Sequence, residues 1–485
     1  AIYELDVPVN ENYITQIKNR PGISVHAKSK WMNAVYVRGT QANIDALTDL
    51  GFVTMVEYAD KGLNTKPFLK NHEDKFGREQ EAQRIEYDYG AAANQTEMIA
   101  ADFLHEQNFT GEGMVIAVMD SGFPDVLTNP AFSHIISDNR LLGTYDFAER
   151  QTNVDGTGSH GARTFSNMGA FLEGGQNFVG TAPDASYYLF RTEFAPSENP
   201  VEEAWWVEAL ERADSLGVDV VNTSLGYQDY DNPNYDHSYE DLDGETTIAA
   251  RGANFAFDKG MLLVTSAGND GGGFTFVGTP GDARGILTVG AVDANGDYAF
   301  FSSIGPTVDG RVKPDVMAQG QDAAVVDQDG DVTFNNGTSF SAPIMAGAVA
   351  SLWQSQPEIR NEQLMQVIRE SANRFMNPTD ELGYGIPNFE DAFNALEILG
   401  IEEQVLKHNF ALYPNPATTQ INFTFPKSIE KATVLLFNVM GSEVLQAEIT
   451  SADNQVNISK LSNGVYLARI IGDTGVTNTF KIVKQ

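Results

Sequence analysis

The stretch MVIAVMD (residues 114–120) is a short, almost continuous apolar run that ends on an aspartate. Four later runs have the same character, at 185–193, 218–226, 260–269 and 285–293. Helical patterns lie between or after them, at 161–171, 201–216, 246–259 and 340–354. Near-continuous apolar strands that alternate with helices are typical of a parallel sheet covered on both faces. The sequence therefore predicts an α/β domain with a mainly parallel sheet, with active residues at the carboxyl ends of its strands.

The composition argues against several classes of protein. Among 485 residues, 66 are acidic and 31 basic, and the resulting net charge of −35 repels nucleic-acid backbones. The chain has no cysteine, which excludes disulfides, thiolate catalysis and Cys-ligated zinc. No apolar run approaches the roughly 18 residues of a membrane span, so we expect no transmembrane segment. The acidity fits a secreted or salt-tolerant enzyme as well as general solubility.

Both ends of the chain differ from the α/β region. Near the start, alternation at 31–40 and 51–60 predicts two strands, and a helix capped by Thr40 lies between them, which together make a small α+β module. A charged, poorly patterned stretch at 70–90 is typical of an exposed linker. The last segment, 405–485, has short strand-like runs separated by Gly and Asn turns and predicts an all-β sandwich.

Four polar residues stand where catalysis needs them. Asp120 ends the first apolar run, His160 lies in a glycine-rich segment that can start a helix, and Asn269 ends a later run. Ser339 precedes a helix whose free N–H groups and positive dipole end lie beside its hydroxyl. A serine needs a base, an orienting carboxylate and an oxyanion partner to become a nucleophile. Each residue alone has an ordinary structural explanation, but together they supply the whole set.

Five motifs carry a resemblance: VIAVMDSG around Asp120, SHG at His160, VNTSLG ending at Gly226, SAGN ending at Asn269 and NGTSFSAP around Ser339. From about 100 to 395 the chain resembles the subtilisin-like serine peptidases, or subtilases. The resemblance implies a subtilisin-like three-layer fold and a serine endopeptidase that hydrolyses peptide bonds in proteins through an acyl-enzyme on Ser339. It also implies that His160 is general base and then acid, that Asp120 orients the imidazole, and that Asn269 stabilises the oxyanion, with no cofactor required.

The same resemblance suggests where substrates bind. Ser224, Leu225 and Gly226 match the strand that pairs with an extended protein or peptide substrate. Gly278 matches the floor of the pocket for the residue before the cut, and a floor without a side chain favours a large apolar or aromatic residue there.

The sequence departs from the family after the His-Gly pair, where Ala162 and Arg163 replace the usual threonine and small or histidine residues. This departure motivates an alternative, a catalytically silent binding protein on the same fold. Another hydrolase, such as an esterase, fits less well because the serine lacks the Gly-x-Ser-x-Gly elbow.

The N-terminal segment gains an interpretation from the family. Residues 1–80 resemble an inhibitory propeptide, which would act as an intramolecular inhibitor and make the chain a self-inhibited zymogen. A linker at 81–100, with a processing region near Glu86 to Gly90, would join it to a catalytic domain at 101–398. The competing interpretation of 1–80 is an ordinary N-terminal domain.

The C-terminal segment, 405–485, resembles the type IX secretion sorting domain of Bacteroidota. Its YPNP opening, central glycine, GVY strand and lysine-bearing end carry the resemblance. It implies export by the type IX secretion machinery to the extracellular space or the cell surface, and a signal peptide removed before Ala1. A substrate- or carbohydrate-binding β-sandwich is the alternative.

A long acidic insertion, 228–245, raises the question of metal. Dense carboxylates suit calcium, and structural calcium is common in the family, but the spacing fits no EF-hand and a solvated loop explains the segment more simply. The sequence therefore leaves structural calcium open and assigns no ligands to it.

Overall fold

The computed structural model describes residues 8–59, 87–271, 273–408, 410–425, 429–438, 442–473 and 477–485. The chain divides into two compact units, Ala1–Asn394 and Ala395–Gln485. Ala1 and the part of the expected linker and processing region up to Glu86 lie outside the described residues.

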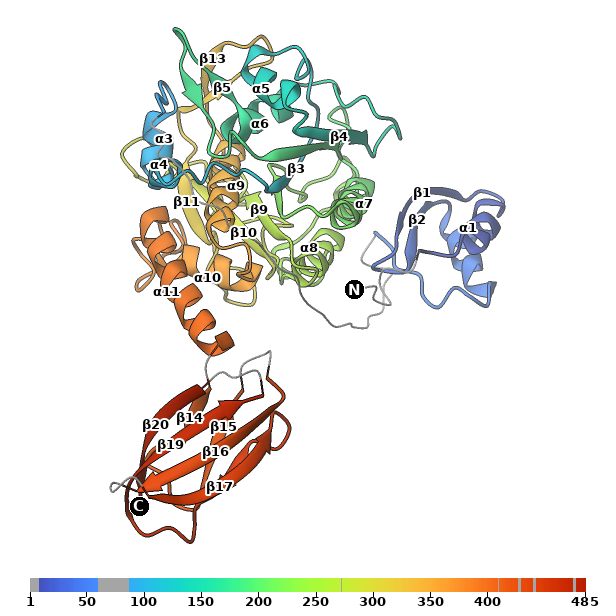
Figure 1. Ribbon diagram of the computed structural model, residues 1–485. Coiled ribbons are helices and arrows are strands. Elements are labelled where there is room, and N and C mark those ends of the chain that lie inside the picture. Colours follow the sequence, from blue (N-terminus) through green and yellow to red (C-terminus); the bar gives the residue numbers. More distant parts are fainter. Residues whose placement is uncertain are drawn as a thin grey trace. The chain divides into compact units, whose positions relative to one another are not determined.

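A seven-stranded sheet forms the centre of the first unit (Figure 1). Its spatial order is β11-β10-β9-β8-β3-β7-β4, and every neighbouring pair is parallel. The strands are β3 (Val115–Asp120), β4 (Leu141–Asp146), β7 (Ser186–Arg191), β8 (Val220–Thr223), β9 (Leu262–Ser266), β10 (Ile286–Val292) and β11 (Val316–Gln319). The five predicted strands and the predicted parallel sheet are confirmed.

Two layers of helices cover this sheet. The four predicted helices are confirmed as α6 (His160–Gly169), α7 (Val201–Leu216), α8 (Ile248–Asp258) and α9 (Thr338–Ser355). Ala117 and Met119 of β3 lie in one core cluster with Trp206 of α7 and Ala253 of α8. Because successive strand side chains alternate between faces, Asp120 lies on the opposite face, where α6 and α9 pack. The result is the three-layer α/β arrangement expected from the sequence (Figure 1).

Shorter elements complete the first unit after the N-terminal module. The helices are α3 (Ala93–Glu97), α4 (Ala101–Glu106), α5 (Ser133–Ser137) and α10 (Asn361–Glu370), and α11 (Phe389–His408) runs across the division between the units. The outlying strands are β5 (Phe171–Leu172), β6 (Phe178–Val179), β12 (Ala323–Val326) and β13 (Val332–Asn335), which form two antiparallel pairs.

The N-terminal module is α+β, but its order differs from the prediction. It contains α1 (Glu11–Lys18), β1 (Ser24–Ser29), β2 (Ala34–Arg38) and α2 (Gln41–Asp45). Thr40 caps α2 as expected, since its side chain accepts from the Asn43 N–H. The predicted strand at 51–60 is wrong for its described part, because Phe52 stacks on Tyr13 at 4.0 Å. The alternating apolar residues there close a small core instead of pairing in a sheet.

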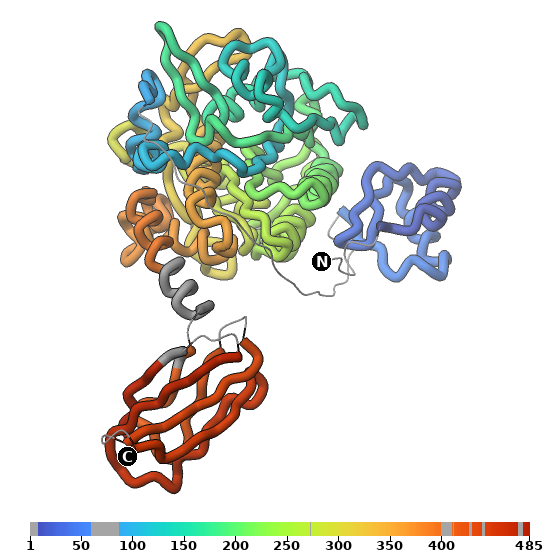
Figure 2. The backbone as a smooth tube through the Cα atoms, in the orientation of Figure 1, coloured from blue at the N-terminus to red at the C-terminus, as the bar shows by residue number. Residues whose placement is uncertain are grey.

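The described strands of the second unit form two antiparallel sheets. They are β14 (Ala411–Tyr413), β15 (Gln420–Thr424), β16 (Lys431–Asn438), β17 (Glu443–Thr450), β18 (Gln455–Asn457), β19 (Gly464–Gly472) and β20 (Thr477–Lys484). One sheet has the order β14-β15-β18 and the other β17-β16-β19-β20. Ile421 and Phe423 from the first sheet share a core with Val434 and Ile470 from the second. Figure 2 traces this unit as extended segments joined by turns, which confirms the predicted β-sandwich.

Candidate active site

Asp120 and His160 meet at the carboxyl end of the central strand. Asp120 is the last residue of β3 and is completely buried, and His160 is the first residue of α6. The His160 Nδ1 atom lies 2.8 Å from Asp120 Oδ1, which also accepts the Ser121 N–H at 2.7 Å. Two residues 40 positions apart are therefore held in direct contact by a strand end and a helix start.

Thr164 completes this contact, and the sequence did not identify it. Its hydroxyl donates to Asp120 Oδ2 at 3.0 Å, and its side chain is fully buried. The available signal was spacing, because a residue four positions after His160 lies on the same face of a helix. Ala162 is buried beneath the site and Arg163 continues the helix through its N–H to Ser159, so the departure from the family pattern leaves the His160–Asp120 contact intact.

The environment of His160 suits a proton acceptor. Burial lowers the pKa of His160, but the charge of Asp120 and its hydrogen bond outweigh burial, so the net pKa lies above its usual value. The side chain is 37% exposed. Among the described residues, none forms a hydrogen bond with its second ring nitrogen, Nε2, which leaves that atom open to a substrate or nucleophile.

Ser339 occupies the first turn of α9, where N–H groups have no partner within the helix. Its hydroxyl donates to the Ser224 carbonyl at a long 3.4 Å, and the Ser224 hydroxyl donates back to the Ser339 carbonyl at 2.9 Å. Within the described part of the chain no hydrogen bond joins Ser339 to His160. The ring of Phe340, the next residue, lies 6.0 Å from the imidazole centre, so α9 brings this turn to the histidine.

Asn269 is fixed beside the same helix start. Its Oδ1 accepts the Thr338 N–H at 2.9 Å and the Thr338 hydroxyl at 3.0 Å, and its Nδ2 lies beside Gly337, 3.7 Å from where a Cβ atom on that glycine would stand. It borders a cleft of about 480 Å³, lined by Asn269, Phe300, Phe301, Gln321, Asn336 and Gly337. A side-chain amide that is held in this way is a preorganised donor.

The expected substrate-binding residues lie close to one another. Ser224, Leu225 and Gly226 directly follow β8, and Tyr227 then pairs with Thr279 through an N–H to carbonyl bond of 2.8 Å. This bridge brings 224–226 beside Gly278. A Cβ atom at Gly278 would lie only 3.3 Å from Gln228 Oε1, so a side chain there would press on the segment after the bridge.

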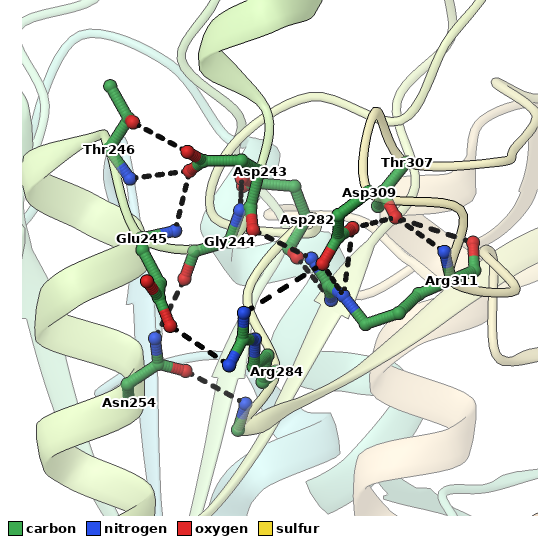
Figure 3. A network of polar contacts seen from close by, with 11 residues as sticks. Asp243, Gly244, Glu245, Thr246, Asn254, Asp282, Arg284, Thr307, Asp309 and Arg311 are labelled. Atoms are coloured by element: carbon green, nitrogen blue, oxygen red, sulfur yellow. Dashed lines mark hydrogen bonds and ion pairs between the residues drawn. The ribbon is translucent and has the colours of Figure 1, made fainter.

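The end of the acidic insertion 228–245 contacts two arginines and forms a turn of its own (Figure 3). Asp243 Oδ1 accepts the N–H groups of Glu245 and Thr246 at 2.9 and 2.7 Å. Arg311 donates to the carbonyls of Asp243 and Asp282 at 3.1 and 2.7 Å. The end of the insertion is therefore ordered by cations of the protein itself.

Two further findings concern metals and membranes. Within the described residues, no group of three or more His, Cys, Asp or Glu side chains could hold a metal ion. In that same part of the chain, no helix is both long and apolar enough to cross a membrane.

Comparison with protein families gives three matches. The subtilase family model matches residues 111–387, more than half of the chain. The Bacteroidota peptidase S8 propeptide model matches 1–75, and the secretion system C-terminal sorting domain model matches 411–485.

Individual relatives agree with these matches. Subtilisin NAT of Bacillus subtilis subsp. natto is 29% identical over 343 residues, which cover 70% of this chain and 79% of the relative. Serine protease AprX of Bacillus subtilis (strain 168) is 26% identical over 316 residues, covering 59% and 67%. The crystal structure of MycP1 from the ESX-1 type VII secretion system has a TM-score of 0.50 at 22% identity, covers 67% of this chain and 93% of that one, and supports the fold alone.

These matches give each part of the chain its role. The propeptide match identifies a zymogen, and the type IX sorting domain indicates secretion. Nothing in the comparisons supports the alternative of a catalytically silent protein. The chain belongs to the subtilase family and is a secreted serine endopeptidase made with a propeptide.

Proposed function

We propose that Asp120, His160 and Ser339 are the catalytic triad of this peptidase. The observation that carries the proposal is the 2.8 Å contact between His160 Nδ1 and a fully buried Asp120, beside the helix that begins at Ser339. Asp120 holds the imidazole with its proton on Nδ1, so Nε2 is free to accept the proton of the Ser339 hydroxyl.

The reaction begins with a small rotation of the serine. The Ser339 hydroxyl leaves the long bond to the Ser224 carbonyl and turns toward His160 Nε2, as catalytic hydrogen bonds often tighten only when substrate binds. The oxygen then attacks the scissile carbonyl while His160 takes its proton. Asn269 Nδ2 and the Ser339 N–H stabilise the oxyanion. His160 returns the proton to the leaving amine, and water repeats the steps to hydrolyse the acyl-enzyme on Ser339.

The test uses a fluorophosphonate label and a casein assay on wild type and Ser339→Ala. We expect the wild type to be labelled and active, and Ser339→Ala to lose both properties. Ser341→Ala is the matched control, because Ser341 is fully buried two residues later in the same turn and should keep labelling and activity. Equal labelling of Ser339→Ala would refute the assignment of the nucleophile.

Substrate binding is proposed to follow the geometry after β8. An extended peptide pairs with Ser224–Gly226, and its side chain before the cut enters the pocket whose floor is Gly278. Phe, Leu and Met should therefore be favoured at that position. A peptide library in which these residues are cleaved poorly would overturn this preference.

Latency is proposed to depend on docking of the N-terminal module against α7. Glu211 of α7 accepts hydrogen bonds from the Ser29 hydroxyl and from the Lys30 and Trp31 N–H groups. Trp31 is 1% exposed and packs in the core cluster that contains Trp206. A buried tryptophan at the centre of such a contact is a typical hot spot, so Trp31→Ala should shorten the lag before activity appears.

Processing and export complete the proposal. Mass spectrometry should find an intact chain only in Ser339→Ala if the propeptide is removed by self-cleavage, whereas identical processing in both proteins would refute that route. The type IX machinery is the proposed partner for export.

Structural calcium stays a prediction, and an unchanged melting temperature in excess EDTA would contradict it.

A further inference from the structure

The two oxygens of the Asp120 carboxylate have unequal support. Oδ1 contacts His160 Nδ1 and accepts from both the N–H and the hydroxyl of Ser121, at 2.7 and 3.3 Å. Oδ2 has one partner among the described residues, the Thr164 hydroxyl at 3.0 Å. Asp120 and Thr164 are both completely buried. Since water has no access, loss of this donor would leave half of a buried anion without a hydrogen bond.

The Thr164 hydroxyl has two acceptors within reach but only one proton. Besides Asp120 Oδ2, it lies 3.1 Å from the carbonyl of Gly161 in the preceding turn. A charged acceptor makes the stronger hydrogen bond, so the hydroxyl points to the carboxylate while Asp120 is ionised. When that charge is neutralised, the Gly161 carbonyl becomes a competitive acceptor. The charge of the carboxylate therefore directs the Thr164 hydroxyl to Asp120.

We propose that Thr164 is a positioning residue for catalysis, whose hydroxyl fixes the Asp120 carboxylate, so that Asp120 holds the His160 imidazole toward Ser339. The proposal rests on the proposed triad. The hydroxyl comes from the position one helical turn beyond His160, directly after the departure from the family pattern at Ala162 and Arg163. Thr164 touches neither substrate nor the reacting atoms and acts only through Asp120.

The proposal has a consequence for the pH dependence. A donor to the carboxylate lowers the affinity of the His160–Asp120 pair for a proton. Removing it should move the acid limb of kcat/KM, which reports loss of the free base, to higher pH. Arg163 on α6 lowers the pKa of His160, and Glu193 after β7, whose own pKa burial raises well above its usual value, is a second titratable group that interacts with the pair. Both are unchanged in the variants below, so a shift reports the missing hydroxyl.

The experiment compares Thr164→Val, which keeps the shape and removes the donor, with Thr164→Ser, which keeps the donor. Rates are measured on the processed enzyme, per active site titrated with fluorophosphonate. Thr164→Val should lose about ten- to hundredfold in kcat with little change in KM, as expected when a buried charge loses a hydrogen bond. Its acid limb should move up by about half a unit to one unit. Thr164→Ser should restore most of kcat and the wild-type limb.

Ser166→Ala provides the matched control. Ser166 is buried on the same helix, but its hydroxyl accepts the Val326 N–H at 2.9 Å, away from Asp120. This variant should lose stability without moving the acid limb.

If Thr164→Val has the wild-type kcat per titrated site and the wild-type acid limb of kcat/KM, Thr164 has no positioning role. The proposed triad would not be affected by that result. If Thr164→Val does not fold, Thr164→Ala replaces it, and its acid limb should move to higher pH by the same amount. A wild-type protein that neither labels nor cleaves peptides would overturn the triad and this proposal together.

Discussion

At the two ends of the strands in the parallel sheet, the buried charged groups differ in whether they leave an atom free for chemistry. At the carboxyl ends, Asp120 is fully buried and paired, but His160 is partly exposed and its Nε2 has no partner among the described residues. At the amino ends, Lys313 and Asp315 are both 2% exposed and lie 2.7 Å apart just before β11. Arg369 Nη2 adds a second cation 2.6 Å from Asp315 Oδ1.

The site at Lys313 and the site at His160 differ in whether every polar atom has a hydrogen-bond partner. The three N–H groups of Lys313 have three acceptors, the Ile286 carbonyl, the Thr288 hydroxyl and Asp315, at 2.9, 2.8 and 2.7 Å. Burial lowers the pKa of Lys313 to about 8 against the attraction of Asp315. A charge whose donors are all used can stabilise the fold but has no free atom for chemistry. The site at the carboxyl ends keeps one open nitrogen, and that is where we place catalysis.

The largest effect should come from Asp120→Asn. The amide keeps the size of the side chain but presents the wrong partner to His160 Nδ1, so the imidazole adopts the wrong tautomer. We expect kcat to fall about 10⁴-fold, while the melting temperature changes little. Kinetics on chains whose propeptide has been cleaved by an added protease, together with thermal unfolding, check this. A kcat within tenfold of wild type would remove Asp120 from the triad and break the comparison.

At the amino ends, Lys313→Met should affect stability instead. Asp315 would lose one of two cations in a buried site, and breaking such a pair lowers the free energy of unfolding by about 3 kcal/mol. Urea unfolding in the Ser339→Ala background measures this without self-digestion. Arg284→Met is the matched control, because Arg284 is 57% exposed in its pair with Glu245 and should change stability by less than about 1 kcal/mol. If both variants lose the same free energy of unfolding, then neither the burial of Lys313 nor its three hydrogen bonds contributes to stability.

The sequence predicted most of the sheet and the positions of Asp120 and His160, but not the contacts that complete the site. Apolar runs mark strands buried on both faces. Two strands of the sheet were missed: β4, because its residues are half-buried and mixed in character, and β11, because its buried run is only four residues long. Thr164 was missed because its role depends on which face of α6 meets β3, and a single sequence pattern does not contain that packing. The strand expected at 51–60 was wrong in its described part for the same reason, since Phe52 and Val53 pack, partly buried, against a small core and have no sheet partner.

A second histidine, His105, gives the prediction with the smallest expected effect, which is a change in the pH dependence of stability. His105 of α4 is 1% exposed and has both ring nitrogens occupied, with Nδ1 2.8 Å from the Tyr89 hydroxyl and Nε2 3.1 Å from the Thr181 carbonyl. Burial lowers the pKa of His105 to about 4, partly opposed by the Thr181 hydrogen bond. Because a carbonyl only accepts, Nε2 carries the proton and Nδ1 accepts from Tyr89, so the neutral ring is saturated.

This saturation fixes the sign of a pH effect on stability. Below pH 6.5 the unfolded chain protonates His105, while the folded chain stays neutral down to about pH 4. The unfolded state therefore binds more protons, and the free energy of unfolding falls as the pH drops through this window, by about 2 kcal/mol from this residue between pH 6.5 and pH 5.0. Urea unfolding of the Ser339→Ala chain at pH 7.5 and 5.0 should show a smaller loss when His105→Gln is added. If His105→Gln loses as much free energy of unfolding between these two pH values as the chain without it, burial and two hydrogen bonds do not keep His105 neutral. The difference between His105 and the partly exposed ring of His160 would then not explain their different roles.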